Sequence, residues 1–324
     1  MSGLTTSPLA DPPTGQAGSG EPHPRSPLTD AAMAALVTLL ERESKADNLA
    51  IIRSRLEELG EIALPWLDSA AASAGGGAGG AVDMALRIRR RSLDAKWDEW
   101  VADPRAGLES GVLLIDRFGD PCGDSDAVRR ALDDLSEAVG RRLVGASDTA
   151  EVIERLNGSL FAEAGFRGNV EAYDEPENSY LSRVLDRRVG IPVSLSVVVL
   201  LLAERLNLPI VGIGMPGHFV LRYGSDPSGP YLDPFGNGRV LSREDCVAWL
   251  QASGFTFAPG MLHPVGPRYI VARMLRNLVA NFGKRGASAE VETLTRYLKR
   301  VIAAPESSAG VHAGLRSDVH SESD

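Results

Sequence analysis

Apolar residues recur at helical spacing through much of the chain. Three such runs follow one another between residues 29 and 73, and a fourth follows the glycine-rich stretch GGGAGG. The same spacing indicates helices around residues 105–117, 125–144 and 149–164. A spacing of three and four residues places these apolar side chains on one helix face, so we expect a succession of helices that pack against each other.

The residue types at several expected helix ends agree with this interpretation. Thr29, Asn48 and Ser125 each precede or open an apolar run, where a short polar side chain can accept a hydrogen bond from a free backbone N–H. Gly60 stands where one run ends, as glycine does at many helix C-termini. We therefore predict N-caps at the first three positions and a helix end at the fourth.

The character of the sequence changes after residue 207. The runs PIVGIGM, HFVLRY and GPYLDPF are short and β-type, and the turn sequence GSDPSG separates the last two. A capped helix is expected at SREDCVAWLQASG, followed by two helices around 267–283 and 287–303. One small antiparallel sheet among many helices predicts a helix-rich α+β fold.

These patterns divide the chain into segments. The short helices near the N-terminus resemble HEAT-type repeats, which commonly form docking surfaces. Both ends are polar and poor in aromatic residues, so they cannot bury enough apolar surface to become ordered. The predicted segments are a disordered leader over 1–28, a HEAT-like helical region over 29–100, a main domain over 101–260, a C-terminal helix pair over 261–304 and a disordered tail over 305–324.

Charge argues against a nucleic-acid partner. The 324 residues carry a formal net charge of −9 and have a sequence pI of about 5.2. A chain of this charge repels phosphate backbones as a whole. One basic cluster, Arg87 with Arg89, Arg90 and Arg91, is interpreted as the solvated face of a helix. We therefore expect the partner to be a protein.

Cysteine and apolar content point to the cytoplasm. The two cysteines, Cys122 and Cys246, lie far apart and lack the spacing of a zinc site or a disulfide framework. The N-terminus has no apolar segment of a secretory signal. The longest apolar run, VVVLLLA, is far shorter than the ~20 residues that cross a bilayer, so we expect no membrane association. No metal site is expected.

The stretch GIGMPG spells G-x-G-x-x-G at Gly212, Gly214 and Gly217. A dinucleotide-binding loop of this pattern needs a helix directly after the glycines, because the helix N-terminus receives the pyrophosphate. Here the next residues, HFVLRY, continue as a strand. We therefore interpret the glycines as turn residues and expect no cofactor.

His218 and Asp233 form a candidate pair. If GSDPSG makes a short turn that places Val220 opposite Asp233, then His218 and Asp233 share one face of the sheet as diagonal neighbours. A carboxylate in that place orients an imidazole, as in a triad of nucleophile, histidine and aspartate. The alternative is structural: His218 is a satisfied core histidine, and Asp233 forms a turn ahead of Pro234.

A nucleophile would be expected at the start of the long apolar helix that follows RRVGIP. Pro192 suits the first helical position, and Ser194 and Ser196 fall in or just beyond the first turn. Either hydroxyl could be activated by a nearby imidazole. Serines near helix starts also commonly satisfy free backbone groups, and that interpretation stays open beside the first.

Several long motifs, in order, resemble the bacterial SirB-one family, a branch of the transglutaminase-like superfamily. They are the stretch from LFAEAGFRGNVEAYDEPENSYL through RRVGIPVSLSVVVLLLAERLNLP, then GIGMPGHFVLRY, YLDPFGNGRVLS and YIVARMLRNLVANF. The resemblance implies a papain-like core with a central helix on an antiparallel sheet. It places His218 on the family histidine, Asp233 on the family aspartate, and Pro192 where active relatives have cysteine.

Three hypotheses follow, and one of them is that the fold is purely structural and binds no ligand. Proline has neither a nucleophilic side chain nor a backbone N–H, so thiol chemistry at residue 192 is excluded. The first hypothesis is therefore a non-catalytic binding or regulatory module that uses the ancestral cleft around His218 and Asp233. The alternative is a serine-dependent hydrolase or acyltransferase, in which Ser194 is the nucleophile, His218 the base and Asp233 the residue that orients it.

Overall fold

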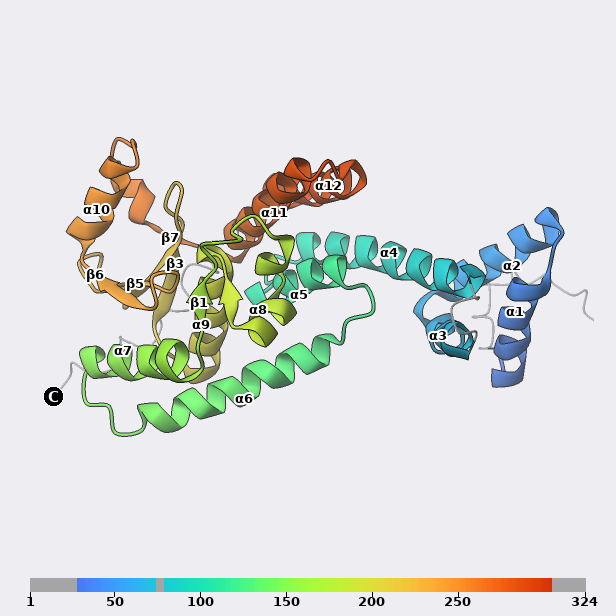
Figure 1. The fold of residues 1–324 in the computed structure, drawn as a ribbon, viewed down its shortest axis with the longest axis horizontal. Helices are drawn as coiled ribbons and strands as arrows, with labels where there is room; N and C mark the ends of the chain where they lie inside the picture. Colours follow the sequence, from blue (N-terminus) through green and yellow to red (C-terminus); the bar gives the residue numbers. More distant parts are fainter. Residues whose placement is uncertain (1–27, 74–78, 305–324) are drawn as a thin grey trace, which may run out of the picture.

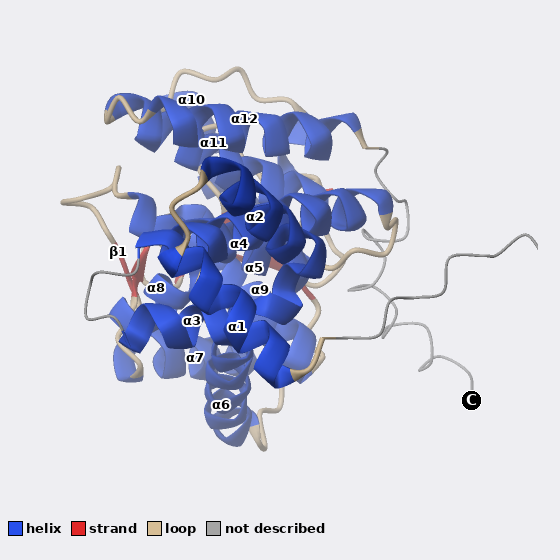
Figure 2. Ribbon diagram, turned by 90° about the vertical axis from the view of Figure 1, so that its right-hand side faces the viewer, coloured by secondary structure: helices blue, strands red, loops and turns tan. Residues whose placement is uncertain are grey.

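Helices dominate the structure, and a small sheet lies among them. The computed structural model describes residues 28–73 and 79–304 (Figure 1). Three N-terminal helices lie at one end, the long helix α4 connects them to the main body, and the sheet lies toward the other end. Seen from the N-terminal end, the helices hide most of the sheet (Figure 2). The expected helix-rich α+β fold is confirmed.

The elements have the following bounds in chain order. The helices are α1 (Asp30–Arg42), α2 (Ala46–Leu59), α3 (Leu64–Ser73), α4 (Gly79–Ala102), α5 (Leu108–Gly119), α6 (Ser125–Leu143), α7 (Thr149–Asn157), α8 (Leu181–Arg187), α9 (Pro192–Leu206), α10 (Arg243–Ala252), α11 (Pro267–Lys284) and α12 (Ser288–Ala303). Short helical turns are η1 (Gly60–Ala63), η2 (Gly158–Glu163), η3 (Pro176–Ser179) and η4 (Pro259–Leu262). The strands are β1 (Arg167–Gly168), β2 (Val189–Gly190), β3 (Ile210–Ile213), β4 (Val220–Tyr223), β5 (Tyr231–Asp233), β6 (Arg239–Leu241) and β7 (Pro264–Val265). None of the described helices offers a stretch long and apolar enough to pass through a lipid bilayer.

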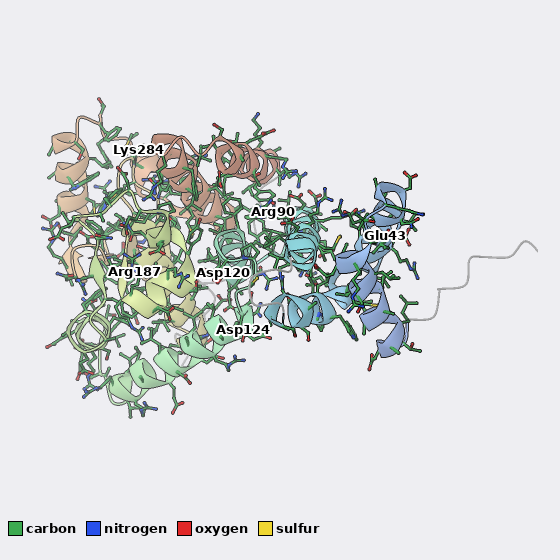
Figure 3. All side chains as sticks on the ribbon, turned by 45° about the vertical axis from the view of Figure 1, so that its right-hand side comes forward. Glu43, Arg90, Asp120, Asp124, Arg187 and Lys284 are labelled. Atoms are coloured by element: carbon green, nitrogen blue, oxygen red, sulfur yellow. The ribbon has the colours of Figure 1, made fainter. Side chains whose placement is uncertain are left out.

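The first two helix starts are capped differently. Thr29 caps α1 through its hydroxyl, as predicted. The predicted cap at Asn48 is wrong, because α2 begins two residues earlier, at Ala46. The carboxylate of Glu43 accepts hydrogen bonds from the backbone N–H of Lys45 and from Asn48 Nδ2, at 2.9 and 2.8 Å (Figure 3). The carboxylate of Glu43, which precedes the helix, thus accepts the hydrogen bonds at this helix start, and the asparagine does not act as the cap.

Two further predicted helix ends lie within one residue of the observed ones. The N-cap of α6 is Asp124, whose carboxylate accepts from the backbone N–H of Asp126 at 2.8 Å. Ser125 is therefore the first helical residue, because the aspartate before it already fills the capping position. Gly60 follows α2 with a φ of +59°, a left-handed value that glycine adopts without strain.

Helix α4 belongs to two hydrophobic cores. Its first half contributes buried side chains to the core of the N-terminal helices: Ala81, Met84, Ala85 and Ile88. Its second half contributes to the core of the main body: Leu93, Trp97 and Trp100. The predicted HEAT-like character of the N-terminal helices and a boundary near residue 100 stay predictions. The predicted leader and tail lie almost wholly outside the described residues, as does most of GGGAGG.

The basic cluster on α4 faces acidic residues of the N-terminal helices. Arg87 and Arg91 lie 3.8 and 3.7 Å from carboxylate oxygens of Glu57, and Arg89 pairs with Asp68 at 2.7 Å. The pairs of Arg87 and Arg91 are largely exposed, so each contributes little stability, whereas the Arg89 side chain is only 10% exposed. The cluster is therefore neutralised in part by its own neighbours.

The main sheet has the strand order β6-β5-β4-β3-β7, and all its pairs are antiparallel. In the β4–β5 pair, Leu221 lies opposite Leu232 and Arg222 opposite Tyr231. GSDPSG forms the turn between these strands, as predicted. Helix α9 contacts strands β3 and β4 on one side and helices α6, α8 and α11 on others.

The glycines of GIGMPG serve close packing and a turn. A Cβ on Gly214 would lie 2.3 Å from the ring of Tyr269, and Gly217 has a φ of +77°. The chain continues directly into β4, so no helix N-terminus follows the glycines. The physical requirement of a dinucleotide loop is not met here.

A buried carboxylate joins two helices of the main body. Asp116 on α5 accepts hydrogen bonds from the backbone N–H and the hydroxyl of Ser182, at 2.9 and 3.0 Å, in the first turn of α8. Only 7% of Asp116 is exposed. Burial raises the pKa of Asp116 above its ordinary value, although the hydrogen bonds from Ser182 act in the opposite direction.

Replacing Asp116 tests this interaction. Asp116→Ala is expected to lower the free energy of unfolding by about 1–2 kcal/mol, because a free N–H of α8 loses its acceptor. Since the folded pKa is raised, the contribution of the carboxyl is greatest at low pH and declines as pH rises through the raised value. Asp116→Asn keeps an acceptor without the charge, so its stability relative to wild type should improve between pH 4 and pH 7. Urea unfolding at both pH values measures this, and an unchanged difference would contradict it.

Candidate functional site

His218 and Asp233 come together at the end of the sheet. His218 Nε2 lies 3.1 Å from Asp233 Oδ1. The observed β4–β5 register, continued by one residue, places Val220 opposite Asp233, which is the predicted alignment. His218 precedes β4 and Asp233 ends β5, so the two are the expected diagonal neighbours on one face.

Aromatic rings hold the imidazole in place. The ring of His218 stacks on Trp249 of α10, with centroids 5.1 Å apart, and meets the ring of Phe235 edge-on at 6.4 Å. The backbone carbonyl of His218 accepts a hydrogen bond from Arg273 of α11 at 3.4 Å. His218 is 9% exposed and Asp233 6%. The pair therefore lies just beneath the surface, in a fixed orientation.

Asp233 is held in its charged form. Burial acts to raise the pKa of Asp233, but the hydrogen bond and charge of His218 and the backbone N–H of Gly236 together lower it below the ordinary value. Gly236 is needed for this approach, because a Cβ there would lie 2.7 Å from Asp233 Oδ2. The carboxylate can thus orient the imidazole through the hydrogen bond to Nε2.

The start of α9 is buried and closed by its own polar groups. Pro192 is the first helical residue, as predicted, and Ile191 precedes it as N-cap. The hydroxyl of Ser194 accepts a hydrogen bond from the backbone N–H of Ile191 at 3.0 Å and donates one to the carbonyl of Asn178 at 2.6 Å. Ser194 is 2% exposed. Both of these hydrogen bonds join it to the backbone, and none joins it to His218 among the described residues.

Asn178 completes this closed arrangement. It is fully buried, and its side chain donates to the carbonyl of Ala172 at 2.7 Å and accepts from Asn169 at 2.9 Å. A buried amide with partners on both sides rigidifies the segment that holds it. Ser196, the other candidate hydroxyl, is fully buried, and its Oγ has no hydrogen-bond partner in the described part of the chain.

Neither of the two cysteines is hydrogen-bonded to the His218–Asp233 pair among the described residues. Cys246 is buried, and burial together with nearby aspartates raises its pKa to about 11. Cys122 is exposed on the loop before α6. Across residues 28–73 and 79–304, no three histidine, cysteine or acidic side chains lie together in an arrangement that could hold a metal ion.

The structure adds three residues to the site that the sequence analysis did not find. Trp249, Phe235 and Arg273 all contact His218. Phe235 lies within the motif YLDPF, so the sequence analysis could have identified it from its place next to Asp233. Trp249 and Arg273 lie on helices whose packing against β4 no local pattern reveals.

Comparison with known proteins identifies the domain that carries this site. Residues 126–276 match the family model described as the transglutaminase-like superfamily. The chain carries a transglutaminase-like domain. The match runs from the start of α6 into α11 and includes the predicted site residues. No solved structure matches the chain at a significant level.

Proteins similar to this chain occur in bacteria and mammals. A UPF0162 protein of Xylella fastidiosa (strain Temecula1 / ATCC 700964) is 33% identical over 184 residues, which cover 55% of this chain and 66% of that protein. A UPF0162 protein of Pseudomonas aeruginosa is 37% identical over 155 residues, covering 46% and 56%. Human F-box only protein 21 is 27% identical over 205 residues, covering 54% and 32%. The chain thus spans two thirds or less of the length of each relative.

Removing the charge of Asp233 tests the coupling in the pair. Asp233→Asn is expected to lower the free energy of unfolding at pH 7 by about 1–3 kcal/mol, because a buried charge-assisted hydrogen bond is weakened. Since the folded pKa is lowered, the contribution of Asp233 is present above the ordinary aspartate pKa of ~3.9 and is lost as pH falls through the lowered value. Urea unfolding from pH 7 to pH 3 should show the deficit shrinking. Asp134→Asn, at an exposed position of α6, is the matched control; an equal effect there would contradict the prediction.

Proposed function

We propose that this protein is a non-catalytic, transglutaminase-like binding or regulatory module of the SirB-one branch. One observation carries the proposal: the position expected for the nucleophile is Pro192, and the nearest hydroxyl in the sequence, that of Ser194, is bonded to backbone groups on both sides. The His218–Asp233 pair therefore has no nucleophile bonded to it within the described part of the chain.

The hydrogen bonds of Ser194 weigh against serine catalysis. A serine nucleophile must pass its proton to a base within hydrogen-bond reach, about 2.6–3.2 Å. Ser194 instead donates to the carbonyl of Asn178 at 2.6 Å. Turning the hydroxyl toward His218 would leave that buried carbonyl and the N–H of Ile191 without a partner, at about 1–3 kcal/mol for each.

The surroundings of the pair support binding. Two large side chains next to the site are partly exposed, Tyr173 by 41% and Phe255 by 38%. Tyr173 contacts Phe235 edge-on, and Phe255 lies beside Trp249 near Gly217. Aromatic side chains are enriched in the parts of binding surfaces that contribute most to affinity. We propose that a protein partner docks over this aromatic rim.

The distribution of the domain also supports a modular role. The matched segment makes up 66% of a bacterial UPF0162 protein but only 32% of human F-box only protein 21. The same kind of domain is thus combined with different further segments, as is common for binding modules. The N-terminal helices and the α11–α12 pair supply additional docking faces. Free thiols at Cys122 and Cys246 favour the cytoplasm as the place of action.

A direct assay separates this proposal from serine catalysis. The purified protein is treated with a fluorophosphonate probe, and in parallel with amine donors and acyl acceptors. We expect no labelling of Ser194 and no transamidation or hydrolysis above that of the His218→Ala variant. Labelling of Ser194 that is lost in both Ser194→Ala and His218→Ala would overturn the proposal in favour of a serine hydrolase or acyltransferase.

Restoring a thiol tests whether residue 192 is the former nucleophile position. In Pro192→Cys, the new thiol stands at the start of α9, where the helix dipole and the His218–Asp233 pair favour a thiolate. Although residue 192 is buried, we expect iodoacetamide at pH 7 to alkylate the introduced thiol, at least ten times faster than it does once the histidine is removed. The rate should fall to that of an ordinary thiol when His218→Ala is added. A slow, His218-independent rate would show that residue 192 does not face the histidine.

A further inference from the structure

A cavity of about 1070 Å³ lies between α4, α5 and α12, and neither His218 nor Asp233 lines it. At one end, the last turns of α5 meet the start of α8 and the hairpin of α11 and α12, elements that pack against each other (Figure 1). We call this part of the cavity the Tyr180 end. Its lining residues are Phe118, Gly119, Tyr180, Phe282, Ala289 and Glu290.

The hydroxyl of Tyr180 has no hydrogen-bond partner in the described part of the chain. Only 8% of Tyr180 is exposed, and its ring lies against Gly119, where a Cβ would stand 2.5 Å from the ring carbon that bears the hydroxyl. The hydroxyl is nevertheless not among the polar atoms that the fold closes off completely. Because a buried tyrosine hydroxyl usually finds a partner, this one indicates room for a ligand that hydrogen-bonds to it.

Glu290 brings a negative charge to the same end. It lies half-buried in the first turn of α12, and within the described residues its carboxylate forms no ion pair and no hydrogen bond. Burial has the largest effect on the pKa of Tyr180 and raises it, and the charges of Asp116, Glu290 and Glu177 raise it further. Arg285 acts in the opposite direction. The surroundings of the hydroxyl therefore favour a cation over an anion.

Aromatic rings form walls of the Tyr180 end. Phe118 and Phe282 are partly exposed and meet edge-to-face, with centroids 6.2 Å apart and planes at 82°. Arg117, which precedes Phe118, uses its guanidinium at the loop before α6, where it donates to the carbonyl of Gly123 at 2.8 Å. Aromatic walls with a carboxylate suit a guanidinium better than an ammonium, because a guanidinium is flat, stacks on rings and is more weakly hydrated.

We infer that the Tyr180 end of this cavity binds a guanidinium group. The N–H edge of the guanidinium donates to the carboxylate of Glu290 and to the oxygen of Tyr180, and its flat face lies against the aromatic walls. Its single positive charge balances the carboxylate of Glu290. The ligand thus supplies the partners that these two side chains lack in the fold.

Ligand-observed NMR titration with N-butylguanidinium tests the site. This cation should bind the whole chain in a saturable manner with a Kd on the order of millimolar, as expected for so small a ligand. N-butylurea is equally flat but neutral, and it should bind at least ten times more weakly. Butylammonium has the charge without the flat face, and it should also bind more weakly. Equal binding of N-butylurea would overturn the inference.

Variants locate the binding. Glu290→Gln should weaken N-butylguanidinium binding at least tenfold. Tyr180→Phe should weaken it about threefold or more without lowering the Tm, because the hydroxyl has no partner in the fold to lose. Glu99→Gln is the matched control, since Glu99 is an exposed acid of α4 that lines the same cavity, and it should bind as wild type does. Wild-type affinity in Glu290→Gln, or an equal loss in Glu99→Gln, would contradict the assignment.

Two further ligands separate the sources of the guanidinium. Agmatine represents a free small molecule, and N-acetyl-arginine methylamide represents an arginine side chain of a protein partner. Tighter binding of the blocked arginine assigns the site to a protein partner, and tighter binding of agmatine assigns it to a small molecule. If both bind no better than N-butylurea, the site does not recognise a guanidinium.

Discussion

The burial of helix α9 on all sides is the constraint on which the main body depends. Every residue from Pro192 to Val199 is buried. A helix that is apolar all round must be covered on every face, because each fully buried valine or leucine stabilises the fold by roughly 1.5–3 kcal/mol. Strands β3 and β4 cover one face, and α6, α8 and α11 cover others. The placement of the sheet, and with it of His218, follows from this requirement.

The burial of α9 also determines how the free backbone groups at its start are hydrogen-bonded. Free backbone groups at a helix start normally find water, but here they are buried and must be satisfied by the protein. Pro192 has no backbone N–H that would need a partner. The hydroxyl of Ser194 accepts a hydrogen bond from the N–H of Ile191 and donates one to the carbonyl of Asn178. Gly190 permits this, since a Cβ there would lie 2.7 Å from Ser194 Oγ. A hydroxyl used in this way stabilises the helix start.

Local patterns in the sequence were sufficient to predict the helices and the turn between β4 and β5, but not the contacts between separate elements. Apolar periodicity predicts the helices, and the turn GSDPSG sets the register that brings His218 to Asp233. The caps at Asn48 and Ser125 were misplaced because neighbouring acids compete for the same backbone donors. The stacking of Trp249 on His218 joins residues from separate elements, and no spacing along the chain encodes it.

Helix α4 joins the N-terminal helices to the main body, and its second half is fixed along α12 over consecutive turns. Tyr297 donates to Asp94 at 2.7 Å and stacks on Trp97 with centroids 5.0 Å apart, and Arg300 pairs with Asp98 one turn further on. Arg268 then closes the end of α4 through its last carbonyls. All of these contacts lie in the second half of α4, whereas its first half packs in the core of the N-terminal helices. One continuous helix thus takes part in both hydrophobic cores, and its last turns are tied to α12 and to the start of α11.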